Sequence, residues 1–309
     1  MESRVMNKIK KREVGGWKNN PLLFVGPYAF LFLIFIVLPV IGATLLSLTD
    51  FNGFQWPGFV GLSNFVSIFT GDQIFMQHAL PVTISFALIV GPVGYFLAFM
   101  LAWSLAQVSP APRAVLALLI YSPSMVGAVA MAVVWGVMFS GHSDGFINSL
   151  LLQWGIIATP IQFTQDPNWL FPIMVIVSLW NSMGLGFLAM LAGVLNINPE
   201  YYEAAYVDGL NNRFQEIVFV TIPSMKPQML FGAVMSLVGT FQAGSIGVQL
   251  SGSNPTPLYA GHTIMNHMED FGFIRFEMGY AAALAVLLLV MIYVTSRFVW
   301  RILGEKQEY

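Results

Sequence analysis

Asn198–Pro227 reads NPEYYEAAYVDGLNNRFQEIVFVTIPSMKP and is a polar island in a strongly apolar chain. Asn198 is suited to cap a helix, and Pro199 is suited to the first helical position. Gly209 can take the left-handed conformation that ends a helix. A helix of about two to three turns is therefore predicted at Pro199–Asp208. The island also holds four of the few carboxylates: Glu200, Glu203, Asp208 and Glu216.

The composition indicates an integral membrane protein. Of 309 residues, 57% are hydrophobic and only 9% are charged, whereas soluble domains carry about 25% charged residues. A chain so poor in charge cannot cover a water-facing surface. It has no Cys, and its four His show no metal-ligand spacing, so we predict no metal and no cofactor bound by this chain. No basic tract beyond the N-terminus suggests nucleic-acid binding.

Six charge-poor stretches are long enough to cross a bilayer, which takes about 20 apolar residues. We therefore predict an all-α, polytopic membrane protein in which the island's short helix lies between transmembrane helices four and five. Residues 1–20 would form a basic N-terminal segment, 21–304 the six-helix domain with its polar loop at 198–227, and 305–309 a C-terminal tail. The predicted spans are Leu22–Leu48, Leu80–Gln107, Ala114–Phe139, Trp169–Leu195, Met229–Gln249 and Met278–Val299.

Pro and Gly residues inside these spans predict kinks, which a helix bundle can absorb. They are Pro39, Pro92, Pro123, Gly184 and Gly186. Ala98, Ala102 and Ala106 form a row of small residues one helical turn apart, which favours close packing against another helix.

The Lys and Arg residues predict the orientation of the spans. All 13 of them except Arg275 fall on one side of the membrane if the N-terminus is cytoplasmic, as the positive-inside rule expects. Both termini and the polar island are thus predicted to be cytoplasmic. Three outer loops, 50–79, 140–168 and 250–277, would contact partners outside the cell. Their acidic side chains are expected to be solvated: Asp72, Asp144, Asp166, Glu269 and Asp270.

The spans hold almost no ionisable side chains, since Arg297 near the cytoplasmic end of the last span is the exception. Proton coupling through an intramembrane carboxylate is therefore not expected. The polar and aromatic lining that remains would suit a neutral solute rich in hydroxyl or amide groups. It comprises Asn181, Ser182, Ser236, Thr240 and Gln242, with Trp135, Trp180 and Phe241.

The chain lacks the means to power transport itself. It has no GxxxxGK[ST] phosphate-binding loop and no catalytic constellation, so no catalytic residue is predicted. A helix exposed on the cytoplasmic side could instead connect the spans to a separate ATPase.

The polar island resembles the EAA loop of binding-protein-dependent ABC importer permeases. The resemblance rests on Glu203-Ala204-Ala205, Asp208-Gly209, Ile217, Ile222-Pro223 and Pro227. Three further segments resemble the carbohydrate-uptake branch, the maltose and glycerol-phosphate permease type. They are Val60-Gly61-Leu62-Ser63-Asn64-Phe65, Gly145-Phe146-Ile147-Asn148 and Met278-Gly279-Tyr280-Ala281-Ala282-Ala283.

The resemblance implies a multi-pass subunit of the bacterial cytoplasmic membrane that works with partners. These are a second, related permease, two cytoplasmic ATPase subunits that bind ATP and Mg, and an extracellular solute-binding protein. The island's helix would be the coupling helix that docks on an ATPase subunit, with Glu203 pairing with a basic residue there. The coupling residues would be Glu203, Ala204, Ala205, Asp208 and Gly209.

The resemblance also places a sugar path on the spans on either side of the EAA loop. The implied path residues are Asn181, Ser182, Leu185, Ser236, Gly239, Thr240, Gln242 and Ala243. Several of these recur at helical spacing on one face. A second interpretation stays open, in which the small residues only allow helices to pack.

A different class of function is also possible for the chain as a whole: a secondary carrier or facilitator of a neutral solute, which would work without an ATPase. The absence of ionisable groups deep in the spans and of an inverted pair of broken spans argues against it. The sequence does not identify the particular solute.

Overall fold

A computed structural model describes residues 21–304, and its regular structure is helical. Within these residues no β-strand forms, and the one β-type pairing is an isolated bridge between Thr49 and Phe59. The predicted all-α fold is therefore confirmed. The predicted basic segment (1–20) and C-terminal tail (305–309) lie outside the described residues.

Three helical stretches are each long and apolar enough to cross a membrane: Val25–Leu46, Phe75–Ala106 and Met278–Leu303. Three further stretches are pairs of helices joined at a sharp bend, so the described chain has three candidate spans, or up to six if each pair crosses as one. The helices of the three unbroken stretches are α2 (Pro21–Phe32), α3 (Leu38–Leu46), α5 (Leu80–Ala106) and α17 (Met278–Leu303).

The first two bent pairs correspond to predicted spans three and four, whereas the third joins most of predicted span five to Arg213–Ser224, which lies in the predicted polar loop. The bends measure 98°, 43° and 86° in chain order. Kinks predicted at Pro123 and Gly184 are confirmed as breaks, whereas Pro92 lies inside the unbroken α5. The pairs are α6 (Pro110–Tyr121) with α7 (Ala128–Met138), α9 (Pro167–Asn181) with α10 (Leu185–Leu195), and Arg213–Ser224, which includes α12 (Arg213–Glu216) and α13 (Ile222–Ser224), with α14 (Lys226–Gln242).

The prediction of one unbroken helix at Met229–Gln249 is wrong. Helix α14 ends at Gln242, because the backbone of Ala243 (φ −73°, ψ 61°) is no longer helical, and α15 (Ile246–Ser251) is a separate short helix. Hydropathy adds up side chains and does not register a change of backbone dihedrals, so the apolar run hides this break.

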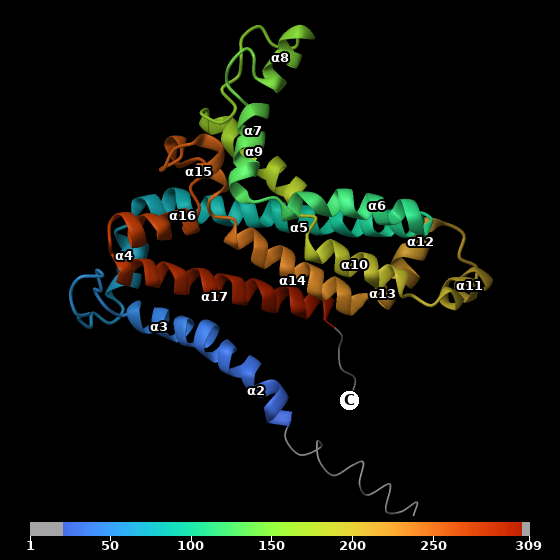
Figure 1. The fold of residues 1–309 in the computed structure, drawn as a ribbon, viewed down its shortest axis with the longest axis horizontal. Helices are drawn as coiled ribbons and strands as arrows, with labels where there is room; N and C mark the ends of the chain where they lie inside the picture. The colour runs from blue at the N-terminus through green and yellow to red at the C-terminus, as the bar shows by residue number, and fades with distance from the viewer. Residues whose placement is uncertain (1–20, 305–309) are drawn as a thin grey trace, which may run out of the picture.

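Helices α5, α10, α14 and α17 run along the long axis of the molecule, and α6 lies beside α5 (Figure 1). The short helix α11 (Pro199–Val207) projects at one end of this bundle, while α4 (Ser63–Thr70) and α16 (Ile264–Glu269) lie at the other. Helices α7, α8 (Phe146–Gln153), α9 and α15 form a side arm. The α2–α3 stretch diverges from α17 toward its N-terminal end (Figure 1).

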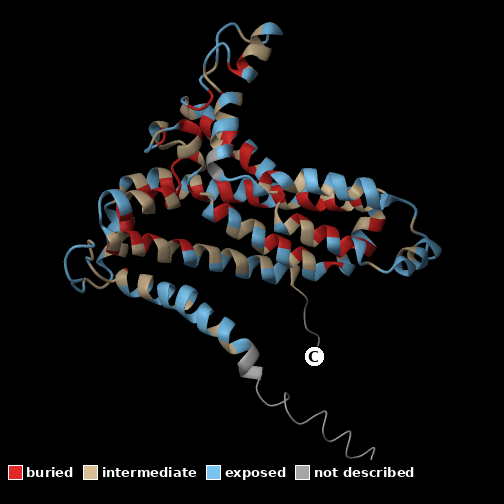
Figure 2. Ribbon diagram, viewed as in Figure 1, coloured by how far each residue is buried: buried red, intermediate tan, exposed pale blue. Residues whose placement is uncertain are grey.

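Buried residues recur along α5, α9, α10 and α14, whereas Val25–Leu46 is largely exposed (Figure 2). Ala98 and Ala102 of the predicted small-residue row are buried with Phe187 and Met190 of α10. The close approach expected for small residues is therefore present between α5 and α10.

Two of the family-like outer segments have structural roles. The Asn64 side chain donates to the carbonyl oxygens of Ser47 (2.9 Å) and Thr49 (2.8 Å), which fixes the end of the first helix. The buried Asn148 donates to the Ser140 carbonyl (2.9 Å) and exchanges two hydrogen bonds with the Ile161 backbone. Buried backbone groups need such partners, so these asparagines hold the loops together.

The expectation that Asp72 is solvated is wrong. Its side chain is only 11% exposed and accepts hydrogen bonds from His267 Nε2 and Tyr280 Oη, each at 2.7 Å. The other ring nitrogen of His267, Nδ1, lies 3.1 Å from Nε2 of His262. Burial alone would raise the pKa of Asp72, but bonds from His267, the Phe75 N–H and Tyr280 lower it to about 2. The sequence gives no sign that loops distant in the chain pack together here.

Candidate functional sites

Helix α11 has the capped form that the sequence predicts. The Asn198 side chain accepts from the Glu200 N–H (3.1 Å), and Pro199 occupies the first turn. The helix ends at Val207, so Asp208 is its C-cap rather than its last residue, and Gly209 follows with φ +100°. A side chain rarely adopts this conformation, which is why glycine suits the turn.

The predicted coupling residues are mostly exposed. Glu203, Ala204, Asp208 and Gly209 are all exposed, and Ala205 is half-buried. No residue of α11 is buried, and the neighbouring Val207 is 87% exposed. The helix therefore presents an acidic and partly apolar face that the described chain leaves uncovered.

Two tyrosines on another face of α11, Tyr202 and Tyr206, attach the helix to the bundle. Tyr206 Oη donates to Glu216 Oε2 (2.9 Å), and Tyr202 Oη lies 3.2 Å from Thr221 Oγ1. The bond to a carboxylate favours the protonated phenol and raises the pKa of Tyr206. Glu216 is buried and also pairs with Arg213 at 2.6 Å. The sequence showed Glu216 only as one acid of the island: its i,i+3 spacing from Arg213 could have predicted the ion pair, but no spacing predicts the bond from Tyr206.

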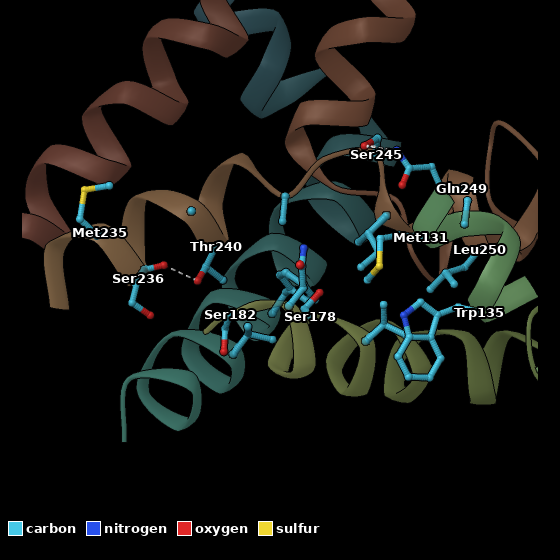
Figure 3. A pocket seen from close by; sticks show the side chains of 18 residues that line it. Met131, Trp135, Ser178, Ser182, Met235, Ser236, Thr240, Ser245, Gln249 and Leu250 are labelled. Carbon is cyan, nitrogen blue, oxygen red and sulfur yellow. Dashed lines mark hydrogen bonds between the residues drawn. The ribbon is translucent and has the colours of Figure 1, made fainter. Parts of the chain in front are cut away.

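A cavity of about 340 Å³ lies between α5, α7, α9, α14 and α15 (Figure 3). Six of the predicted path residues line it: Asn181, Ser182, Ser236, Gly239, Thr240 and Ala243. Leu185 lines a smaller neighbouring cavity of about 150 Å³, which shares Ser182 and Ser236. Gln242 lines neither of these two cavities, and it is exposed. The structure thus brings residues from the two sides of the polar loop to one space.

The cavity lining is uncharged and combines apolar side chains with several polar ones. The hydroxyls of Ser182, Ser236 and Thr240 donate to backbone carbonyls at 2.7, 3.1 and 2.6 Å, which leaves their oxygens as acceptors. Trp135 supplies an aromatic surface that stacks on Phe139, and its buried Nε1–H has no partner within the described residues. The arrangement can accept a polar, neutral molecule that has both hydroxyl groups and an apolar face.

Three polar lining residues were missing from the prediction: Ser178, Ser245 and Gln249. Ser178 precedes Asn181 and Ser182 by three and four residues, so helical spacing could have found it. Ser245 and Gln249 reach the cavity only because the chain breaks after α14 and places α15 beside it, which the sequence pattern does not show.

An apolar helical bundle with an uncharged central cavity and an exposed terminal helix describes a membrane transport subunit. The chain matches the family of binding-protein-dependent transport system inner membrane components over residues 92–302. It belongs to that family and is a permease subunit of an ABC importer.

Individual relatives match nearly the whole chain. The probable ABC transporter permease protein YesP of Bacillus subtilis (strain 168) is 33% identical, with 92% of this chain and 88% of that protein covered. The lactose transport system permease protein LacF of Rhizobium radiobacter is 30% identical, with 92% of each covered. A chain in the crystal structure of a bacterial ABC transporter involved in import of the acidic polysaccharide alginate superposes with TM-score 0.71 at 25% identity, covering 97% of this chain and 99% of that one.

Proposed function

We propose that this chain and a second, related permease form the path for a neutral sugar or oligosaccharide, and that two ATPase subunits drive it through α11. An extracellular binding protein would deliver the sugar. The observation that carries the proposal is the pairing of an uncharged cavity with an exposed helix on the chain segment that leads into α14, which lines that cavity. In this scheme α11 and both termini face the bacterial cytoplasm.

The coupling role falls to Glu203, Ala204, Ala205, Asp208 and Gly209. Glu203 is exposed on α11, so its carboxylate is free to pair with a basic residue of an ATPase subunit. Gly209 allows the sharp turn after the helix. ATP and Mg would be bound by the ATPase subunits, not by this chain.

The neutral lining supports the sugar as substrate. Named relatives transport lactose and arabinooligosaccharides. The similar crystal structure belongs to an importer of an acidic polysaccharide, but no Lys or Arg lines the described cavity here, so nothing in it would offset a substrate's negative charge. The substrate path would run past Asn181, Ser182, Leu185, Ser236, Gly239, Thr240, Gln242 and Ala243.

Purification of the tagged chain from native membranes in mild detergent tests the assembly. We expect a second permease and an ATPase subunit to co-purify.

Glu203→Ala and Gly209→Pro should leave the amount of this chain in the membrane unchanged but separate ATP hydrolysis from uptake, because each alters the docking helix or its turn.

The substrate is tested by uptake of a panel of radiolabelled neutral and acidic oligosaccharides into cells that carry or lack the gene. We expect gene-dependent uptake of a neutral sugar that stops when cellular ATP is depleted. Gene-dependent uptake that continues without ATP, together with no ATPase in the purified complex, would instead establish a facilitator.

A further inference from the structure

Helix α11 is too short to be stable by itself. It has nine residues, none of them buried, and isolated helices shorter than about 12 residues are marginal in water. Its position relative to the bundle must therefore come from specific contacts. In the part of the chain that the structure describes, two side-chain hydrogen bonds join it to another helical segment: Tyr206 to Glu216 and Tyr202 to Thr221.

These four residues form what we call the tyrosine clasp. Tyr202 and Tyr206 are four residues apart and so lie on one face of α11. Glu203 and Val207 are each turned about 100° from the preceding tyrosine and lie on the exposed side. The helix thus has one face held by the clasp and another face free for a partner.

The clasp leads directly to the cavity. Glu216 is the last residue of α12, and Thr221 ends the π-helical turn Ile217–Thr221 that follows it. This segment continues through an 86° bend into α14. Helix α14 supplies Ser236, Gly239 and Thr240 to the cavity wall. A displacement of α11 therefore has a short route to the wall of the solute path.

Glu216 is fixed firmly enough to serve as the anchor. A carboxylate that is only 3% exposed is costly to bury unless it is paired. Both Tyr206 and Arg213 donate to its Oε2 atom, and the Thr221 hydroxyl lies 3.3 Å from its backbone carbonyl. Because separating the buried carboxylate from these partners would cost free energy, Glu216 keeps α11 and α12 together.

We propose that Tyr202, Tyr206 and Glu216 are positioning residues that transmit the movement of α11 to α14 and so to the cavity. This inference rests on the proposed function, because it needs an ATPase that moves α11. It assigns to the clasp a task distinct from docking, which belongs to the exposed side of the helix that carries Glu203 and Val207.

The chain has no cysteine, so one introduced cysteine can report on the cavity without knowledge of the solute. Gly239→Cys is suitable because a Cβ atom there meets nothing within 4 Å. Membrane vesicles that contain the assembled transporter are treated with a membrane-impermeant maleimide, with and without MgATP. If ATP reorients the spans, the rate at which the cysteine is labelled should change several-fold.

The clasp is then removed in this reporter background by Tyr202→Phe with Tyr206→Phe, which keeps both rings. We expect the ATPase subunit still to co-purify but most of the several-fold effect of ATP on labelling to be lost, because a hydrogen bond to a charged group contributes about tenfold to an equilibrium. Tyr201→Phe is the matched control, because Tyr201 is 58% exposed on the same helix and should leave the response unchanged.

The outcomes separate the two proposals. A full ATP response in the double variant, with no response in Glu203→Ala, would overturn the role of the clasp and leave the coupling helix intact. No ATP response in the parent reporter would overturn the proposed function itself. If the double variant does not accumulate in membranes, Tyr206→Phe alone carries the same test, and immunoblots confirm its level.

Discussion

Gly279 is a residue that has no room for a side chain. Its N–H donates to the Phe51 carbonyl at 2.8 Å, and a Cβ atom there would overlap the backbone carbonyl oxygen of Thr49. Neither neighbour can rotate away, because both are main-chain groups. We predict that Gly279→Ala lowers the free energy of unfolding by about 1–3 kcal/mol, the usual range for overpacking.

Thermal unfolding of the detergent-purified protein measures this effect. Gly42→Ala is the matched control, because a Cβ atom at Gly42 meets nothing within 4 Å. Equal melting temperatures for the two variants would show that the segment after α3, with Thr49 and Phe51, does not pack on α17 in this way.

His262 makes stability depend on pH. Burial first, and the neighbouring His267 second, lower its pKa from 6.5 to about 4, while His78 adds to this effect and Asp270 and Asp72 oppose it. Between pH 4 and 6.5 the unfolded chain binds the proton and the folded chain does not, so stability falls as the pH falls through this window. We predict a loss of about 2 kcal/mol between pH 7 and pH 5.

Melting temperatures at pH 7, 6 and 5 test this prediction for the wild type and for His262→Gln, which should show a smaller slope. His142→Gln, at an exposed histidine, should keep the wild-type slope. The lowered pKa of Asp72, about 2 against 3.8, acts only below about pH 4 and is therefore separable. A slope that His262→Gln leaves unchanged would contradict the assignment.

At the scale of elements, local chemistry made α11 predictable from the sequence. Its start depends on Asn198 and Pro199, and its end depends on Gly209, all within 12 residues of one another. Capping is decided by neighbours in the chain, so the sequence contains the information. The apolar runs likewise showed which stretches are long enough to cross a membrane.

The breaks inside the apolar stretches were harder to predict from the sequence. Gly184 marked one of them, because a residue without a Cβ atom can adopt the φ −95°, ψ −141° found there. Ala243 gave no such sign, and its departure from helix separates α14 from α15. This break decides the cavity, since it brings Gln249 to the lining. The burial of Asp72 was missed as well, because its partners His267 and Tyr280 are 195 and 208 residues away in the chain.

At the scale of the molecule, the cavity lies where the side arm meets the bundle, since α7, α9 and α15 come from the arm and α5 and α14 from the bundle (Figure 1). Movement of the arm against the bundle would therefore open or close it. Because Arg213–Ser224 follows α11 and joins α14 through an 86° bend, α11 and the cavity wall belong to one continuous piece of chain.

Filling the cavity should stop transport without unfolding the protein. Gly239 faces open space, since a Cβ atom there meets nothing within 4 Å, and it lines the cavity. We predict that Gly239→Trp lowers ATP-dependent sugar uptake more than tenfold, because a bulky side chain occupies a space of about 340 Å³. Co-purification of the ATPase subunit and the melting temperature should stay near the wild-type values.

Gly136→Trp is the matched control, since Gly136 also has nothing within 4 Å of its Cβ position but is absent from the cavity lining. It should leave uptake unchanged. Gly239→Ala should retain most uptake, because a single methyl group leaves the cavity open. Normal uptake by Gly239→Trp would mean that the solute crosses elsewhere, at the interface with the second permease, and that Ser236, Gly239 and Thr240 serve only to pack α14 against α5.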